Sequence, residues 1–416
     1  MIKQFIRDSF IYTISVVLTR GISFLCLPLY LSVLSPSDFG VFDYIGVVGS
    51  FVLVVVTLEI AQGIHRYLPE VRDDVVEKRK FISTALIFTL ACYAALIFLS
   101  AIFSNELVDI FLGPGEGELV VAAVTMFASN ALLILVQAQL RSELRVKQHV
   151  VSSVIVAVCS AAFSVAALYW FEAGVIGMLI SITCGNLIGF VYATTGTRHV
   201  YNLEFSPRHL KLLLGFSAPL VPSSLGVILA LLIDRVMIKN MMSLDDLGVF
   251  GVAARFATLT TLLSMGVQQA LTPLIYNRYR EEGTPRDIAR LFWLYCGLSV
   301  IAVGAIALVG PALLAVIAPP SYQGAASIVP LVCASALISK LYIFSPGLVI
   351  AKKTGVLSLI NLAIGILSIA LNFALIPAYG LVGAASGTLI AAVVGFAMNA
   401  VVAQRYYPIR YFPSAS

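Results

Sequence analysis

Long apolar stretches alternate with short polar segments along nearly the whole chain. About twelve of these stretches reach the roughly 20 apolar residues that an α-helix needs to cross a bilayer. The predicted spans are residues 10–33, 41–64, 82–103, 119–140, 150–171, 174–196, 213–238, 248–272, 292–317, 326–350, 356–376 and 382–404. The gaps between them hold at most about 17 residues, whereas a folded domain needs about 50. The pattern therefore predicts an all-α polytopic membrane protein.

The cations lie almost entirely in every second gap between these stretches. Residues 34–40 contain no Lys or Arg, and residues 65–80 contain five. By this alternation, 21 of the 26 Lys and Arg residues fall on one side of the membrane. Cationic segments stay cytoplasmic, so we expect an inner-membrane protein with both termini in the cytoplasm. The net charge of +5 then reflects topology and does not indicate nucleic-acid binding.

Composition excludes several other classes of protein. Sixty per cent of the residues are hydrophobic and 11% are charged, against about a quarter charged in soluble domains. The six cysteines lie in predicted spans and form no CxxC pair, so neither disulfides nor a metal site are expected. No G-x-x-x-x-G-K-[ST] run is present, so we expect no ATPase in the chain. Catalytic residues and cofactors are likewise not expected, and the apolar run after residue 10 is predicted to be a retained span, not a signal peptide.

The two halves of the chain resemble each other at a nearly constant offset. SPSDFGVF at 35–42 matches SLDDLGVF at 243–250, and GVIG at 174–177 matches GLVG at 380–383. Six spans separate the copies, so both halves have the same orientation, as in parallel transporter repeats. We therefore predict two pseudo-symmetric six-helix lobes, 1–205 and 206–416. A central cavity between them would alternate its access by rocking.

Charged residues inside the spans are candidates for function, because each costs about 2.5–3.5 kcal/mol near the bilayer centre. The cations are Arg20, Arg235, Arg255 and Lys340. The carboxylates are Glu59, Asp234 and Asp43, which lies near the interface and is taken as an ordinary helix-end residue. All but Lys340 belong to spans 1, 2, 7 and 8, which suggests that these spans line a shared polar cavity. The four cations are predicted to bind an anion, since a guanidinium donates two parallel hydrogen bonds to a phosphate. Glu59 and Asp234 are predicted to couple transport to an ion or proton.

These residues also have structural interpretations. Arg20 and Glu59 could form an ion pair that only holds helices together. Prolines inside spans predict bends, because proline removes a backbone hydrogen bond. These prolines are Pro28, Pro219, Pro222 and Pro346.

Several motifs carry a resemblance to a known family. LSPSDFGVF, APLVPSSLG, LIDRVMI and PAYGLVGAASGT resemble the polysaccharide-biosynthesis (O-antigen, Wzx-type) flippases of the multidrug/oligosaccharidyl-lipid/polysaccharide exporter superfamily. The resemblance covers essentially the whole chain and implies a MATE-like fold. It implies that an undecaprenyl-pyrophosphate-linked oligosaccharide moves from the inner to the outer leaflet, for lipopolysaccharide or other surface polysaccharide. Membrane lipid, a glycan polymerase and chain-length machinery would be its partners.

Three alternatives stay open at this point. A cation-coupled drug or small-molecule exporter could use the same fold, although span 1 carries Arg20 and no acidic residue. A membrane enzyme such as an O-antigen polymerase or ligase needs a large external loop, and the longest here has about 15 residues. A sugar transporter of the major facilitator type should carry a motif similar to G-x-x-x-D-x-x-G-R in the loop after span 2. The loop in this sequence lacks that motif.

Overall fold

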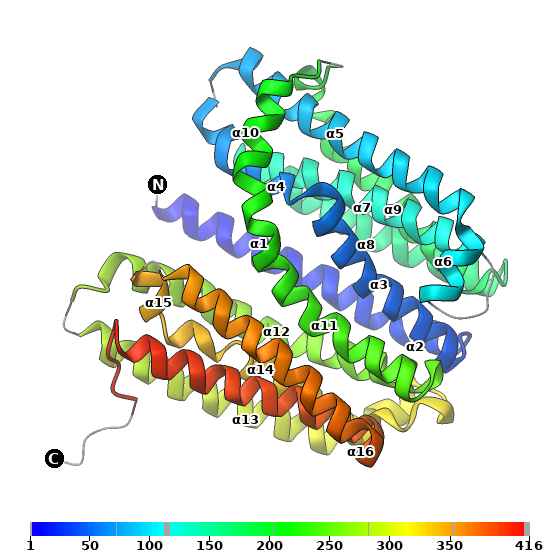
Figure 1. The fold of residues 1–416 in the computed structure, drawn as a ribbon, viewed down its shortest axis with the longest axis vertical. Helices are drawn as coiled ribbons and strands as arrows, with labels where there is room; N and C mark the ends of the chain where they lie inside the picture. The colour runs from blue at the N-terminus through cyan, green and yellow to red at the C-terminus, as the bar shows by residue number, and fades with distance from the viewer. Residues whose placement is uncertain are drawn as a thin grey trace. The chain divides into compact units, whose positions relative to one another are not determined.

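The computed structural model describes residues 2–71, 73–111, 117–202, 204–281, 283–351 and 353–411. Every regular element in these residues is helical (Figure 1), which confirms the predicted all-α class. Contacts group the helices into two compact units. Unit 1 is Met1–Leu34 with Val41–Ile228, and unit 2 is Ser35–Gly40 with Leu229–Ser416. The predicted lobes, 1–205 and 206–416, describe a sequence repeat and stay a prediction.

Within the described residues, the first half of the chain consists of ten α-helices, α1 to α10, and three short 3₁₀ helices, η1 to η3. They are α1 (Ile2–Leu25), α2 (Leu27–Leu31), α3 (Pro36–Thr57), α4 (Ile60–Tyr67), η1 (Leu68–Val71), α5 (Val75–Ile102), α6 (Ser104–Phe111), α7 (Glu118–Ser142), α8 (Val146–Tyr169), α9 (Gly174–Thr195), η2 (Arg198–Val200), α10 (Pro207–Ser217) and η3 (Ala218–Leu220). In unit 1, α5, α7 and α9 pack in a row, and α8 packs on α9.

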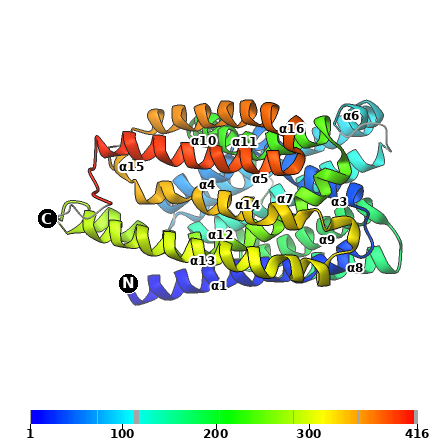
Figure 2. The same cartoon turned by 90° about the horizontal axis from the view of Figure 1, so that it is seen from below.

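The second half continues with α11 and ends with a long kinked helix. Its elements are α11 (Val221–Met241), α12 (Leu244–Arg278), α13 (Thr284–Ile317), η4 (Pro320–Tyr322), α14 (Ala325–Ile338), η5 (Leu341–Phe344), α15 (Gly347–Ile350) and α16 (Thr354–Gln404). Within unit 2, α14 packs against α12, α13 and α16 (Figure 2).

The predicted spans correspond to these helices. Ten helices of the described chain are long and apolar enough to cross a membrane, and the pair Pro207–Gly226 and Leu231–Met241 counts as an eleventh span. The helix at Gly355–Gln404 contains a non-helical residue, Gly380, and covers two predicted spans. Each of the predicted spans therefore has a counterpart, and the chain is a multi-pass membrane protein.

The four prolines at which bends are predicted lie at or next to helix interruptions. Pro28 follows the break between α1 and α2, Pro219 lies in η3, Pro222 begins the helix after it, and Pro346 precedes α15. Span 2 also breaks, between α3 and α4, although no proline is present there. The span predicted over 326–350 is divided into α14, which ends at Ile338, then η5 and α15.

The repeated octapeptides begin helices in the same way. Ser35 Oγ and Ser243 Oγ each donate to the carboxylate three residues later, Asp38 or Asp246, at 2.6 Å. Each serine oxygen also accepts from that residue's backbone N–H at 3.1 Å. This reciprocal cap satisfies donors at the helix start, and its presence in both copies explains why the two sequences match.

Three polar segments predicted to share one side of the membrane meet at one end of unit 1. They are residues 65–81, 141–149 and 197–211. Lys78 Nζ lies 3.8 Å from Glu143 Oε1, and His209 Nε2 lies 2.8 Å from Glu77 Oε2. Such a meeting is what the alternation of cationic segments requires.

Candidate functional site

A buried carboxylate on α11 is held by two donors from α16. Asp234 is 2% exposed. Its Oδ1 accepts a hydrogen bond from Asn372 Nδ2 at 2.7 Å, and its Oδ2 accepts one from Thr388 Oγ1 at 3.1 Å. The donors are 138 and 154 residues away in the sequence. Among the described residues, the buried Oδ1 of Asn372 has no hydrogen-bond partner. This cluster therefore holds several oxygen atoms, the type of ligand that hard cations prefer, inside unit 2.

The kink in α16 brings the two donors together. Gly380 has φ +57° and ψ −134°, which interrupts the helix between Asn372 and Thr388. Beyond the kink, a side chain at Gly383 would overlap the Leu375 carbonyl. A Cβ at Gly387 would lie 2.9 Å from Asn372 Oδ1. Glycine is therefore needed for the two halves of α16 to pack closely.

Arg235 and Arg255 are both placed over aromatic rings in unit 2. Arg235 is 8% exposed, and its guanidinium carbon lies 5.2 Å from the centroid of the Phe250 ring. The guanidinium carbon of Arg255 lies 5.9 Å from the centroid of Phe39, at the start of α3. Cation–π contacts of this kind are worth about 0.5–2 kcal/mol and restrict the orientation of the guanidinium.

Lys340 and Arg20 are half-buried and belong to different units. Lys340 precedes η5, at the point where the helix of span 10 is interrupted. Arg20 lies in the second half of α1, which is continuous from Ile2 to Leu25.

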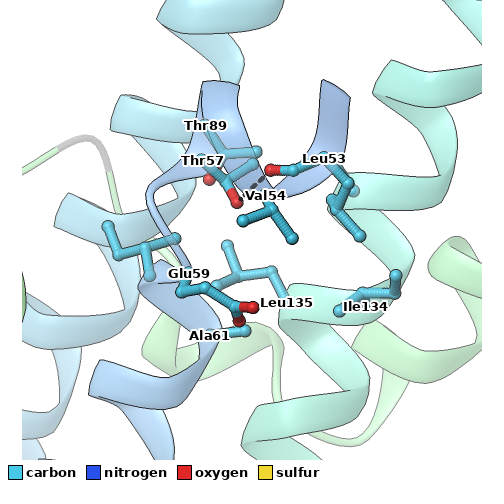
Figure 3. A pocket seen from close by; sticks show the side chains of 10 residues that line it. Leu53, Val54, Thr57, Glu59, Ala61, Thr89, Ile134 and Leu135 are labelled. Atoms are coloured by element: carbon cyan, nitrogen blue, oxygen red, sulfur yellow. Dashed lines mark hydrogen bonds between the residues drawn. The ribbon is translucent and has the colours of Figure 1, made fainter. Parts of the chain in front are cut away.

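Glu59 lies beside a small cavity in unit 1 (Figure 3). It starts α4 with φ +58°, in the left-handed region, and Leu58 before it has φ +49°. The cavity has a volume of about 50 Å³, and Figure 3 shows Glu59 on one side of it and Thr57 and Thr89 on the other. Such a volume admits a water molecule, since one needs about 10–15 Å³.

Every polar side chain that lines this cavity offers an oxygen acceptor. Thr57 Oγ1 donates its proton to Leu53 O at 2.7 Å, and Thr89 Oγ1 donates to Ala85 O at 2.9 Å. Their lone pairs remain available to accept. In the part of the chain that the structure describes, the Glu59 carboxylate takes part in no hydrogen bond or ion pair, so the structural bridge from Glu59 to Arg20 is not formed. The cavity therefore suits a proton, a water molecule or a small cation.

The structure brings together some of the predicted residues. Asp234, Arg235, Arg255 and Lys340 belong to unit 2, and Arg20 and Glu59 belong to unit 1. Asn372 and Thr388, the partners of Asp234, are not among the residues predicted from the sequence. An isolated Asn in the apolar segment LNFAL, shortly before a glycine-rich turn, could have indicated the first of them.

The chain has the fold of known transporters. It has a TM-score of 0.74 with an inward-facing multidrug resistance MATE family transporter of the MOP superfamily, at 15% identity, covering 93% of this chain and 95% of that one. It also has a TM-score of 0.74 with the lipid II flippase MurJ in an inward closed conformation, at 15% identity, covering 95% and 87%. The chain is therefore a polytopic membrane protein with a MATE-like fold, as predicted.

Sequence comparison identifies the family. The model described as "Polysaccharide biosynthesis protein" matches residues 5–275. The chain is 22% identical over 284 residues to "Lsg locus putative protein 1" of Haemophilus influenzae, covering 66% of this chain and 67% of that protein. The chain belongs to the polysaccharide biosynthesis protein family. Family and fold together support a membrane transporter of the flippase class, not an enzyme.

Proposed function

We propose that the chain is a flippase for an undecaprenyl-pyrophosphate-linked oligosaccharide. It moves this lipid from the inner to the outer leaflet of the bacterial cytoplasmic membrane by alternating access, with both termini in the cytoplasm. Family membership carries the proposal, because a polysaccharide biosynthesis protein on a transporter fold is suited to a membrane-bound glycan precursor. A glycan polymerase and chain-length machinery would receive the oligosaccharide for O-antigen or a related polymer.

In this proposal the cations within the spans hold the pyrophosphate. Arg20, Arg235, Arg255 and Lys340 supply positive charge where water is scarce. Guanidinium groups bind phosphate oxygens in pairs, and the rings under Arg235 and Arg255 orient their planes.

The two carboxylates couple transport to an ion or a proton. Asp234 belongs to a buried set of oxygen ligands, and Glu59 faces a cavity lined by acceptors. The Asp234 cluster also favours a second candidate, a cation-coupled drug or small-molecule exporter on the same fold. The nature of the transported molecule separates the two.

Reconstituted vesicles test the proposed substrate. Purified protein in vesicles that contain a lipid-linked oligosaccharide should raise the fraction of glycan that a lectin reaches on the opposite side. Arg255→Ala should reduce the initial rate at least about tenfold, because a charge-assisted hydrogen bond to phosphate is worth about 1.5–3 kcal/mol. The matched control is Arg290→Ala, which removes an arginine whose side chain is 82% exposed. Transport of a cationic drug with no glycan movement would instead establish the exporter.

Cysteine labelling tests the proposed topology. Single cysteines at Ser104 and Ser243 should react with an impermeant thiol reagent in intact cells, and one at Lys78 should react only after lysis. The background protein has its six cysteines replaced. Labelling at Lys78 in intact cells would reverse the orientation.

A further inference from the structure

Basic side chains from three helices lie together at one end of unit 1. They are His65 on α4, Arg141 at the end of α7 and His149 at the start of α8. The charge of Arg141 acts on both histidines, and His149 also lies within electrostatic range of His65. Tyr12 from α1 packs edge-on against His149, with ring centroids 5.2 Å apart. We call His65, Arg141 and His149 the basic cluster.

No carboxylate of the described chain neutralises the basic cluster. Glu143, the acidic residue of the same turn, is held by Arg145 Nε at 3.0 Å and by Lys78 Nζ at 3.8 Å. Among the described residues, the Arg141 guanidinium forms no ion pair or hydrogen bond. The buried Nδ1 of His149 likewise has no hydrogen-bond partner there. Buried polar atoms normally have a partner, so this nitrogen indicates a position that a ligand atom can occupy.

The hydrogen bonds around His65 determine where its proton lies. Ser142 Oγ donates to Ala138 O at 2.9 Å, so the 3.0 Å contact between Ser142 Oγ and His65 Nδ1 is a bond donated by the imidazole. The neutral ring therefore carries its proton on Nδ1 and a lone pair on Nε2. Burial and the charge of Arg141 lower the pKa of His65. A bound anion opposes both effects, and a protonated ring then gains Nε2–H as a donor.

We propose that the basic cluster binds the pyrophosphate group of a ligand. Arg141 supplies a planar pair of donors. Each imidazole supplies one further donor when it takes up a proton from water, and the bound anion favours that protonated form. This cluster is distinct from the predicted cations within the spans. Its residues belong to segments 65–81 and 141–149, at the end of unit 1 that is predicted to face the cytoplasm. Its role as the loading site for the lipid-linked substrate rests on the proposed function.

Binding measurements on the purified full-length protein test the proposal. Inorganic pyrophosphate is one probe, and nanodiscs that contain undecaprenyl pyrophosphate are the other, with phosphatidylglycerol nanodiscs as the lipid control. Arg141→Ala should weaken pyrophosphate binding at least about tenfold. Arg141→Lys should recover only part of it, because an ammonium lacks the planar fork. Lys147→Ala, which removes an exposed charge from the same segment, should change binding less than about twofold.

The outcomes separate the site from its role. Loss of binding to both probes in Arg141→Ala supports a loading site for the lipid, and loss for the soluble probe alone limits the site to free pyrophosphate. Unchanged binding of both probes overturns the proposal, as does an equal loss in Lys147→Ala, since that indicates non-specific attraction. A wild-type protein that binds pyrophosphate through Arg141 but moves no glycan in vesicles keeps the site and refutes the flippase. If the protein transports glycan but its pyrophosphate binding does not depend on Arg141, the flippase is supported and the proposed site is refuted.

Discussion

Asp234 and Glu59 are both carboxylates within predicted spans, but their surroundings differ. Asp234 is almost fully buried, and two side-chain donors hold its two oxygens. Glu59 is only half-buried and faces a cavity. It precedes α4, and its own backbone adopts the left-handed conformation. Both residues are predicted from the sequence to couple transport to an ion or a proton.

The difference indicates two kinds of site. At Asp234 the ligands are already in place, so the carboxylate belongs to the packing of unit 2 as well as to any ion site. At Glu59 the space is open, and its occupant can change without breaking a hydrogen bond of the described chain. Substitution of Asp234 should therefore lower the stability of the protein strongly. Substitution of Glu59 should change transport coupling and leave stability nearly unchanged.

The largest effect is expected from Asp234→Leu. The substitution leaves the Asn372 Nδ2 donor buried without its acceptor, and such a loss costs about 1–3 kcal/mol. Thr388 Oγ1 loses its contact with Asp234 but keeps Ala384 O as an acceptor. The unfolding midpoint in detergent should fall strongly, as should the yield of folded protein. Asp234→Asn is the control, since it keeps the shape and an acceptor oxygen and should lose less. Equal stability of Asp234→Leu and the wild type would show that the cluster does not support the fold.

A smaller loss is expected from Gly383→Val, which acts on the Asp234 cluster from a distance. A side chain at this position overlaps the Leu375 carbonyl and forces the halves of α16 apart. Overpacking of this kind costs about 1–3 kcal/mol. Gly365→Val is a matched control, because a Cβ there meets no atom within 4 Å. The unfolding midpoints of the two variants, measured side by side, should differ; if they coincide, the close approach is not required.

The smallest effect on stability is expected from Glu59→Gln, together with a large effect on coupling. Glu59 has no hydrogen bond to lose within the described residues, so the free energy of unfolding should change by less than about 1 kcal/mol. The amide mimics a protonated carboxylate, so glycan movement in vesicles should no longer respond to an imposed pH gradient. Glu118→Gln, which removes an exposed carboxylate away from the cavity, is the control and should keep the response to the gradient. A full response to the gradient in Glu59→Gln would exclude Glu59 as the proton-coupling residue.

The positions of helix breaks could be predicted only in part from the prolines in the sequence. Pro28 and Pro346 lie at interruptions, whereas Pro311 and Pro330 lie inside continuous helices. The break at Glu59 has neither proline nor glycine. Proline therefore indicated several breaks but not all, because packing against neighbouring helices also determines where a helix ends.

The sequence by itself determined the properties that depend on local transfer of side chains into the bilayer. These are the spans and the alternation of cationic segments. Only the tertiary structure decided which polar groups meet: Asp234 with Asn372 and Thr388, and Arg141 with His65 and His149. Hydropathy is summed along the chain within one span, whereas these contacts join helices that are far apart in sequence. Their distances depend on how helices pack, including the kink at Gly380, and no local pattern of apolar residues specifies that packing.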